Sequence, residues 1–316
     1  MMQELKLLKN KKIGLVVGGI SPEREVALNG GKAVEKALKN LGLKYVKFDL
    51  NERTRKDIFG MIKRAKIDVV FMVLHGSYGE DGRLQGGLDM IKVPYIGSDA
   101  LSSAVAMDKV FTKQILIQNG IPTPAFEEVG KGKKVKEVKV RMKLPLVVKP
   151  VDCGSTIGIS IVKTKKELNK ALKLAFKYSG KVFVEKYING TEITVPILND
   201  TALPVIEIIP KTRFYDYKAK YVKGMSTHIL PARLPEKVYA KAQELAVKTH
   251  MVLGLKDFSR VDFMVGKNNK LYVLEINSLP GLTATSLLPE AARFSGVSFE
   301  EMVLKMLVYP VKNQRF

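Results

Sequence analysis

The sequence has few of several features, and each shortage excludes a class of protein. It has one cysteine, Cys153, in 316 residues, which rules out an internal disulfide and is typical of a reducing cytosol. Its longest apolar run, residues 69–74, is too short to cross a bilayer. Residues 1–12 alternate lysine with leucine and lack the apolar core of a signal peptide. No repeat or low-complexity segment stands out. We therefore expect a cytoplasmic globular protein with no membrane partner.

Acidic residues are also scarce, because 31 Asp and Glu stand against 53 Lys and Arg, a formal net charge of +22. Such an excess can indicate a nucleic-acid partner. The lysines, however, are scattered through most of the predicted helices. The densest cluster, residues 131–143, is typical of one solvated helix and has no interleaved aromatic residues. This pattern favours solubility, or a lysine-rich proteome, over a nucleic-acid interface, and we expect no nucleic-acid partner. On either interpretation the charge attracts anionic nucleotides.

With 46% hydrophobic and 27% charged residues, the chain can bury a sizeable core, and its length suggests two or three lobes. The first stretch alternates strand and helix, with strands expected at 13–17, 45–50 and 68–74 and helices at 22–41 and 54–65. This alternation predicts a parallel α/β sheet. Ligands of such sheets bind beyond the carboxyl ends of the strands, where the loops 18–25 and 75–82 lie.

The rest of the chain is expected to form two further stretches. The middle one opens with helices and continues with strands at 146–149, 158–162 and 182–187 and a helix at 165–178. The last one is richer in strands, at 192–198, 203–209 and in a hairpin, and closes with two helices after Thr285.

The hairpin is the most informative segment, SRVDFMVGKNNKLYVLEINSLPG, residues 259–281. Two apolar runs flank Asn268-Asn269, a pair that suits a tight primed turn because asparagine tolerates positive φ. We therefore predict that Lys267 faces Lys270 across the turn. The period of two then divides the side chains between two faces. The polar face holds Arg260, Asp262, Glu275 and Asn277, and the packed face holds Val261, Phe263, Tyr272, Leu274 and Ile276.

In this register Asp262 lies directly opposite Glu275, and opposed carboxylates repel each other. A divalent cation between them turns that penalty into a binding site, to which the side-chain carbonyl of Asn277 adds a neutral oxygen. Ligation by a few protein oxygens suits Mg²⁺, which keeps waters and takes its other ligands from phosphates. The alternative is a surface salt-bridge ladder with Arg260 and no metal.

The segment VLEINSLPG resembles the metal-binding segment of ATP-grasp ligases. Four more motifs make the sequence similar to the D-alanine–D-alanine ligase family: GGISPEREVALNGG from residue 18, HGSYGEDGRLQG from 75, YDYKAKY from 215 and PGLTATSLLPEAAR from 280. The resemblance runs from about residue 13 to residue 307, in the family's order. It implies a three-lobed ATP-grasp fold, with an N-terminal parallel α/β substrate domain (1–97), a central α+β lid domain (98–187) and a C-terminal α+β catalytic domain (188–316).

The resemblance also implies an activity. The family joins two D-alanine molecules to D-alanyl-D-alanine through a D-alanyl phosphate intermediate, for peptidoglycan precursors. It implies ATP as co-substrate, two Mg²⁺ ions that Mn²⁺ can replace, a cytoplasmic location and a homodimer.

Matching positions give the implied nucleotide and metal contacts. Lys109 and Lys149 hold ATP phosphates as flexible point charges, and Lys220 adds positive charge around the transferred phosphoryl group. The other implied ATP contacts are Gly154, Ser155 and Thr156 in a loop that closes over the phosphates, Glu185, Lys186 and Ile188 at the adenine, and Glu192 at the ribose hydroxyls. The implied magnesium ligands are Asp262, Glu275 and Asn277.

On the substrate side, the resemblance implies that Glu23 fixes the amino group of the first D-alanine. It also implies a hydrogen-bonded triad of Glu23, Ser155 and Tyr221, which latches the phosphate loop to the loop that covers the substrate. Glu23 follows a helix-start signal, and its alternative role is to complement the helix dipole. The second D-alanine is implied to contact His75, Arg260, the Gly281 N–H, Ser286 and Leu287.

For the chemistry, the resemblance implies that Arg260 and the Gly281 N–H stabilise the tetrahedral oxyanion, and such donors are worth roughly 3–4 kcal/mol each. His228 and His250 carry no motif and are expected to be structural.

The sequence departs from the family pattern at Thr156, where a second serine is more common, and at Cys153 and Leu279, where polar residues are frequent. Three alternatives stay open: a ligase that makes D-alanyl-D-lactate, another ATP-grasp enzyme with a different acid and amine, and a nucleotide- or nucleic-acid-binding protein without catalysis. Tyr221 favours D-alanine over D-lactate. The acidic pair Asp262 and Glu275 argues against the last alternative, because it repels phosphate unless a metal is bound.

Overall fold

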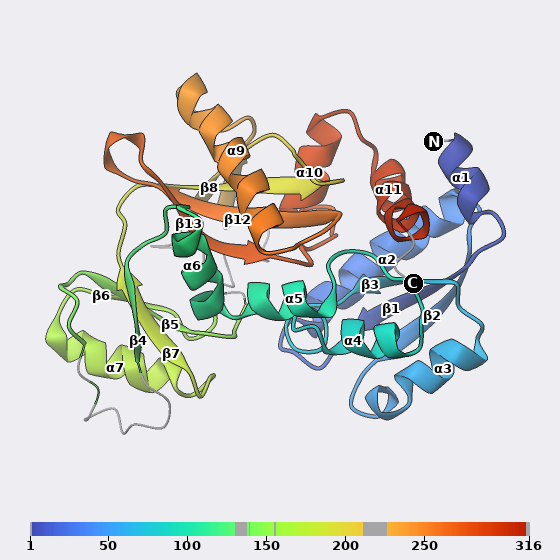
Figure 1. The fold of residues 1–316 in the computed structure, drawn as a ribbon, viewed down its shortest axis with the longest axis horizontal. Coiled ribbons are helices and arrows are strands. Elements are labelled where there is room, and N and C mark those ends of the chain that lie inside the picture. Colours follow the sequence, from blue (N-terminus) through green and yellow to red (C-terminus); the bar gives the residue numbers. More distant parts are fainter. Residues whose placement is uncertain (1, 130–137, 139, 155, 211–225, 314–316) are drawn as a thin grey trace.

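The computed structural model describes residues 2–129, 138, 140–154, 156–210 and 226–313. Three β-sheets organise these residues, one parallel and two antiparallel (Figure 1). This confirms the expected combination of an N-terminal α/β part with α+β parts. None of the described helices is both long and apolar enough to cross a membrane.

The N-terminal part is a parallel sheet of order β2-β1-β3 with helices packed around it. Its strands are β1 (Lys12–Gly18), β2 (Lys44–Leu50) and β3 (Val69–Val73), and its helices are α1 (Met2–Leu8), α2 (Arg24–Asn40), η1 (Thr54–Lys56), α3 (Ile58–Arg64) and α4 (Arg83–Met90). β3 is buried along its whole length, as covered parallel strands usually are. α2 packs so closely on β1 that a Cβ on Gly31 would lie 2.5 Å from Cγ1 of Val17. The single helix expected at 54–65 is interrupted at Asp57, whose φ of −131° is not helical.

The last two helices are α10 (Leu287–Phe294) and α11 (Phe299–Lys312). α11 lies against α1 and α2, although these segments stand at opposite ends of the chain (Figure 1). Met302 and Leu307 of α11 share one apolar core with Ile13 and Leu15 of β1. The C-terminal helix therefore completes the N-terminal core.

The middle part begins with α5 (Ala100–Met107) and α6 (Lys109–Gln118). Its sheet has the order β4-β7-β5-β6, with β4 (Phe126–Val129), β5 (Leu146–Pro150), β6 (Ser160–Val162) and β7 (Val182–Lys186). α7 (Lys165–Ala175) starts with a capping box between Thr164 and Glu167 and packs on β5 and β6. The lysine-rich stretch 131–143 was expected to be a helix, but its described residues, 138 and 140–143, are not helical. Val140 and Met142 instead pack against the core beneath α7.

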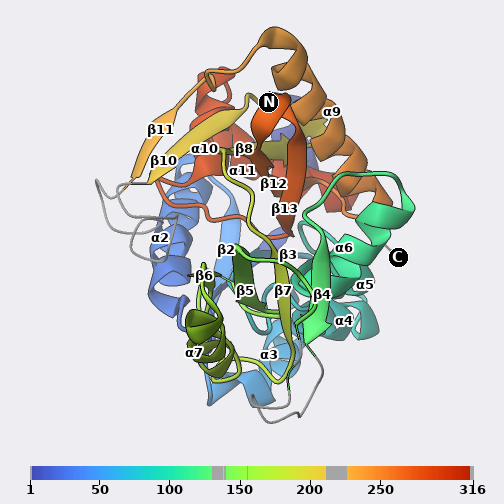
Figure 2. The same cartoon turned by 90° about the vertical axis from the view of Figure 1, so that its left-hand side faces the viewer.

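The third sheet has the order β11-β10-β8-β12-β13, with β9 paired to β8. Its elements are β8 (Thr191–Leu198), β9 (Thr201–Ala202), β10 (Ile206–Pro210), β11 (Ser226–Ile229), β12 (Phe258–Val265), η3 (Lys267–Asn269) and β13 (Leu271–Asn277), and α9 (Glu236–Val252) covers one face. The opposite face lies toward the sheet of β5 and β7 (Figure 2), and residues of both sheets line one cavity.

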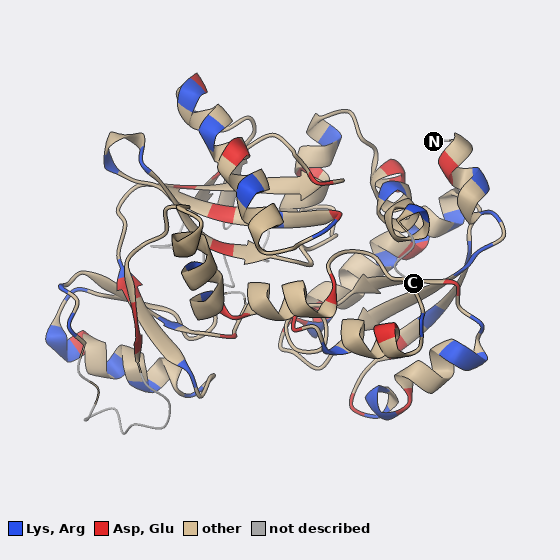
Figure 3. Cartoon of the chain, viewed as in Figure 1, with Lys and Arg blue, Asp and Glu red and all other residues tan. Residues whose placement is uncertain are grey.

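Basic residues occur on helices and loops of all three parts (Figure 3). The described chain thus carries its positive charge in a dispersed form, as the sequence indicated.

Candidate active site

The hairpin of β12 and β13 has the expected register at its polar end. Arg260 pairs with Asn277, and Asp262 pairs with Glu275. At the other end, Asn268 and Asn269 have φ values of 56° and 57°, so the asparagine turn is also confirmed. The two carboxylates are therefore cross-strand neighbours in the antiparallel ladder.

The packed face of the hairpin was predicted incorrectly near the turn. A bulge changes the register after Asp262, so that Phe263 pairs with Val273 rather than with Leu274. One extra residue reverses the alternation of side chains beyond it. Val273 therefore packs in the core, while Leu274 lines the cavity. Tyr272 remains partly exposed and Lys270 lies over its ring, so neither Tyr272 nor Leu274 is a core residue.

Asp262 is buried and accepts hydrogen bonds from three neighbouring residues. Arg260 donates from Nε to Oδ1 at 2.9 Å and from Nη2 to Oδ2 at 2.8 Å. Thr194 of β8 donates to Oδ1 at 2.6 Å, and Asn277 donates to Oδ2 at 3.1 Å. The alternative without a metal correctly expects an ion pair with Arg260, but the pair is buried, not on the surface. Sequence reasoning missed Thr194, because its place opposite Asp262 depends on the pairing of β8 with β12.

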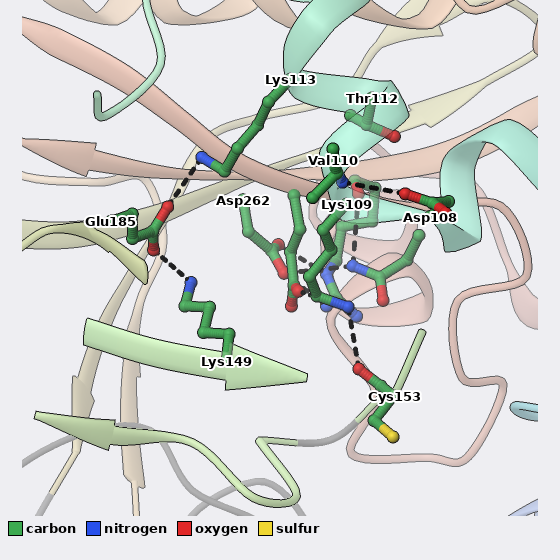
Figure 4. Close-up of polar contacts among 12 residues, drawn as sticks. Asp108, Lys109, Val110, Thr112, Lys113, Lys149, Cys153, Glu185 and Asp262 are labelled. Carbon is green, nitrogen blue, oxygen red and sulfur yellow. Dashed lines mark hydrogen bonds and ion pairs between the residues drawn. The ribbon is translucent and has the colours of Figure 1, made fainter. Parts of the chain in front are cut away.

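A second charge cluster lies on the facing sheet, where Glu185 of β7 contacts two lysines (Figure 4). Lys149 of β5 lies on the same face of the sheet as Glu185, two positions along from Val147, which is the residue opposite Glu185. Its Nζ is 2.6 Å from Oε1 of Glu185. Lys113 of α6 approaches the other oxygen, with Nζ 2.7 Å from Oε2. Lys113 is fully buried, and Glu185 is 2% exposed.

The two lysines keep Glu185 ionised. Burial alone would raise the pKa of Glu185, but the charges of Lys113 and Lys149 outweigh it and lower that pKa. Burial likewise opposes the charge of Lys149, yet Glu185 and Glu275 together raise the pKa of Lys149. Burial lowers the pKa of Lys113, and contact with Glu185 opposes this effect.

Lys109 lies at the start of α6, between the hairpin and the loop that leads to Gly154. Asp108 caps the helix by accepting the N–H groups of Val110 and Phe111 (Figure 4). Nζ of Lys109 donates to the carbonyl of Cys153 at 2.8 Å and lies 3.5 Å from Oε2 of Glu275. It therefore links the acidic hairpin to this loop.

The structure groups most of the predicted site residues around two cavities. The cavity between the two antiparallel sheets is lined by Lys149, Thr156, Glu185, Lys186, Ile188, Glu192, Asp262 and Glu275, among others. The second cavity is lined by Glu23, His75, Gly154, Arg260, Asn277, Gly281, Ser286 and Leu287. Ser155, Lys220 and Tyr221 lie outside the described residues, and so does the proposed triad with Glu23.

Glu23 lies at the start of α2 and is 5% exposed. The neighbouring Arg24 fixes this turn, because its guanidinium donates to Asp49 at 2.7 Å and to the carbonyl of Leu50 at 2.9 Å. Gly154 lies directly against the carboxylate, since a Cβ there would be 3.1 Å from Oε2 of Glu23. The segment that begins at Gly154 and the carboxylate of Glu23 are thus adjacent.

Two titratable groups beside Glu23 are strongly perturbed. His75 is buried, and burial lowers its pKa, although Glu23 opposes the shift. Among the described residues, Nε2 of His75 has no hydrogen-bond partner. Glu80 was not predicted as a site residue, yet it lines the second cavity. Burial and the charge of Glu23 raise the pKa of Glu80 to about 8, while its Oε2 accepts the N–H of Gly76 at 2.6 Å.

Ser286, which precedes α10, lines the same cavity and is close to Gly281. A Cβ on Gly281 would lie 2.8 Å from Oγ of Ser286, and the same oxygen accepts the N–H of Thr283 at 3.0 Å. The two histidines expected to be structural make side-chain contacts elsewhere: His228 with Glu290 and His250 with Ser259 and Asp200.

Comparison with known proteins identifies the family. Residues 115–308 match the model described as the D-ala D-ala ligase C-terminus, and residues 46–98 match the D-ala D-ala ligase N-terminus. The chain belongs to the D-alanine–D-alanine ligase family. It is 46% identical over 300 residues to the D-alanine–D-alanine ligase of Geotalea uraniireducens, covering 95% of this chain and 96% of that protein. The Carboxydothermus hydrogenoformans ligase is 45% identical over 314 residues, covering 96% and 99% of the two chains.

A solved structure of a D-alanine–D-alanine ligase has the same fold. The Bacillus anthracis enzyme complexed with ATP superimposes with a TM-score of 0.83 at 33% identity, covering 96% of this chain and 98% of that chain.

In this family member a third cavity near the hairpin shares lining residues with each of the other two. This smaller cavity is lined by Glu80 and Gly154, which also line the cavity of Glu23, and by Lys109, Glu275 and Asn277. Glu275 also lines the cavity between the sheets, and Asn277 also lines the cavity of Glu23. Residues of β13 therefore form the boundary shared by both.

Proposed function

We propose that this protein joins two D-alanine molecules in an ATP-dependent reaction that passes through D-alanyl phosphate. The observation that carries the proposal is the junction of the two cavities at Glu275, Asn277 and Gly154. A nucleotide between the sheets then presents its terminal phosphate to an amino acid held near Glu23. Catalysis of phosphoryl transfer is mainly positioning and neutralisation of charge, which this arrangement provides.

Nucleotide binding is assigned to the cavity between the sheets. Lys149 lies at its edge, with 9% of its side chain exposed, and can turn to a phosphate oxygen. Lys109 reaches the same region from α6. Glu185, Lys186 and Ile188 line the wall, where their backbone groups would bind the adenine, and Glu192 would contact the ribose. Thr156, from the loop after β5, completes the lining.

The donor set of the hairpin fits magnesium. Among the described residues, no group of three or more His, Cys, Asp and Glu side chains is arranged for a metal ion. Asp262, Glu275 and the amide oxygen of Asn277 would instead hold Mg²⁺ or Mn²⁺ through few protein oxygens, as expected when phosphates supply the remaining ligands. The ion would neutralise negative charge around the transferred phosphoryl group. Arg260 has to release Asp262 for this ligation, and the side-chain amide of Asn277 has to turn.

The second cavity supplies the groups for the two amino acids. Glu23 would fix the ammonium of the first D-alanine, whose carboxylate attacks the γ-phosphorus of ATP and displaces ADP. The amine of the second D-alanine then attacks the acyl phosphate carbon, and inorganic phosphate leaves. Arg260 and the N–H of Gly281 would stabilise the oxyanion of this step, where each such donor is worth roughly 3–4 kcal/mol. Ser286 and Leu287 would contact the second D-alanine.

Further expectations from the sequence belong to the same proposal. They are a homodimer, a cytoplasmic location and three lobes divided near residues 97 and 187. Sedimentation of the purified protein tests the first of them.

Product analysis tests the function itself. The purified protein is given ATP and Mg²⁺ with D-alanine or with L-alanine, and ADP, phosphate and peptide are measured. We expect phosphate release only with D-alanine, together with one dipeptide per phosphate. Equal turnover of L-alanine would contradict the assignment, and so would phosphate release without dipeptide. Addition of D-lactate in a parallel reaction distinguishes an ester-forming ligase.

A further inference from the structure

Lys113 is a buried cation that the proposed reaction does not use. Its side chain is fully buried, and it is not among the residues that line the cavity between the sheets, whereas its partner Glu185 and the second lysine, Lys149, both line that cavity. Lysine is almost never fully buried unless it is paired. The burial of the charged Lys113 side chain behind the cavity wall therefore needs a physical explanation.

The contacts of Lys113 anchor it in place. Nζ donates to Oγ1 of Thr123 at 2.6 Å, and that hydroxyl donates to the carbonyl of Val273 in β13 at 2.8 Å. The same ammonium lies 5.9 Å from the centre of the Phe126 ring. Lys113 thus connects the sheet that carries Glu185 with the sheet that carries the acidic hairpin. Because its side chain is fully buried, its ammonium group cannot exchange Glu185 for solvent.

The three side chains have a charge surplus. One carboxylate, Glu185, is shared by two ammonium groups at 2.7 Å and 2.6 Å. In a protein that lacked Lys113, movement of Lys149 away from Glu185 would leave the Glu185 carboxylate buried without a positive partner, which is strongly unfavourable. With Lys113 present, the carboxylate keeps a partner, and Lys149 can leave.

We propose that Lys113 is a positioning residue, the permanent internal counter-ion of Glu185, which leaves Lys149 free to bind a nucleotide phosphate. Lys113 acts only through Glu185 and Lys149, and the nucleotide never touches it. The inference rests on the proposed contact between Lys149 and a phosphate of ATP. The sequence gives one indication that Lys113 lies near the site: Lys109 and Lys113 are four residues apart on α6 and hence on the same face of the helix.

Equilibrium binding of two nucleosides tests this role without any measurement of turnover. Calorimetry compares ATP, which has phosphates, with adenosine, which has none, for the parent and for Lys113→Met. Methionine keeps the length of the side chain and removes the charge. We expect Lys113→Met to raise the Kd for ATP by about ten- to a hundredfold, the value of one charge-assisted contact. The Kd for adenosine should stay within about twofold of the parent value, because the adenine wall is unchanged.

A rescue variant separates the counter-ion role from simple packing. In Lys113→Met/Glu185→Gln the internal cation and its anion are both absent, so an ion pair with Glu185 no longer holds Lys149. We expect this double variant to return the Kd for ATP to within about threefold of the parent. The matched control is Thr123→Val, which removes a hydrogen-bond partner of Lys113 but no charge, and it should bind ATP like the parent.

Three outcomes would overturn the inference. ATP affinity that stays at the parental value in Lys113→Met, while Lys149→Met weakens ATP binding, would show that Lys113 has no such role. If the double variant binds ATP as weakly as Lys149→Met does, Lys113 is only a packing residue. This comparison of Kd values tests the inference even if Lys113→Met alone does not fold. Unchanged ATP binding in Lys149→Met would remove the proposed phosphate contact together with the inference, although the ligase assay above would still report on the function.

Discussion

The nucleotide and substrate cavities treat charge in opposite ways. Between the sheets, the buried cluster of Lys113, Lys149 and Glu185 has two lysines for one carboxylate, although Glu192, Asp262 and Glu275 also line that cavity. Around Glu23, a second acid, Glu80, lies close enough that Glu23 raises its pKa. The ring of His75 beside them is buried, and burial lowers its pKa.

This difference matches the charges of the two proposed ligands. The lysines beside Glu185 can stabilise an arriving phosphate, and the carboxylate of Glu23 can stabilise an arriving ammonium, which is the charge of an amino acid at its α-nitrogen. An arriving ammonium would compensate the charge of Glu23 that helps to raise the pKa of Glu80, whereas Lys149 has to leave its ion pair with Glu185 before it can bind a phosphate.

The largest loss of activity should come from replacing Glu275, which lies at the boundary between the two cavities. Glu275→Gln keeps the shape of the side chain and removes one of two opposed carboxylates. We expect kcat to fall by at least about a hundredfold, since preorganised charges at a reacting group are each worth roughly that much. Thermal unfolding should change little, because Glu275 is partly exposed. Near-normal turnover at ordinary Mg²⁺ would mean that the cross-strand pair does not serve a metal.

A smaller and more selective effect is expected from the substrate side. Glu23→Gln removes the charge that would fix the ammonium of the first D-alanine, so its KM should rise about tenfold or more, while the Kd for ATP stays unchanged. Glu25 is the matched control, because it is an exposed acid in the same first turn of α2. An equal effect of Glu25→Gln would show that Glu23 acts only on the helix dipole.

Sequence reasoning succeeded where the pattern was local. The asparagine turn and the period of two predicted Asp262 opposite Glu275, and the pairing holds because the bulge after Asp262 cancels a one-residue offset beside the turn, where Val265 pairs with Leu271. The same period failed for Tyr272 and Leu274, because one bulged residue reverses the alternation and leaves no mark in the apolar pattern. The interruption of the predicted helix at Asp57 is another local irregularity that the apolar pattern does not reveal.

Residues whose importance depends on tertiary pairing were missed. Lys113 looks like any helix lysine until Glu185 is seen to approach it from a strand more than seventy residues later. Thr194 likewise meets Asp262 only when β8 pairs with β12. Glu80 stands in the motif HGSYGEDGRLQG, but burial and proximity to Glu23, not the motif, give it a perturbed pKa.

The smallest expected effect concerns Glu80 and the stability of the apo-protein. Its folded pKa of about 8 lies above the ordinary value of 4.5. Between these values the folded protein holds a proton that the unfolded chain has released. The contribution of Glu80 to stability therefore falls as pH rises through that window and levels off above it. Glu80→Gln removes this dependence, because glutamine has no proton to lose.

We therefore expect Glu80→Gln and the parent to unfold at similar temperatures near pH 4.5. As pH rises toward 8, the variant should become the more stable of the two, by at least about 2 °C in Tm. The exposed Glu25→Gln variant should show no such divergence. If the substrate side is built to receive an ammonium, D-alanine should narrow the gap by stabilising the parent more than the variant at pH 8. A Tm difference that stays constant across pH would mean that Glu80 is ionised in the folded protein like an ordinary surface acid, and the contrast between the two cavities would then rest on Glu23 and His75 alone.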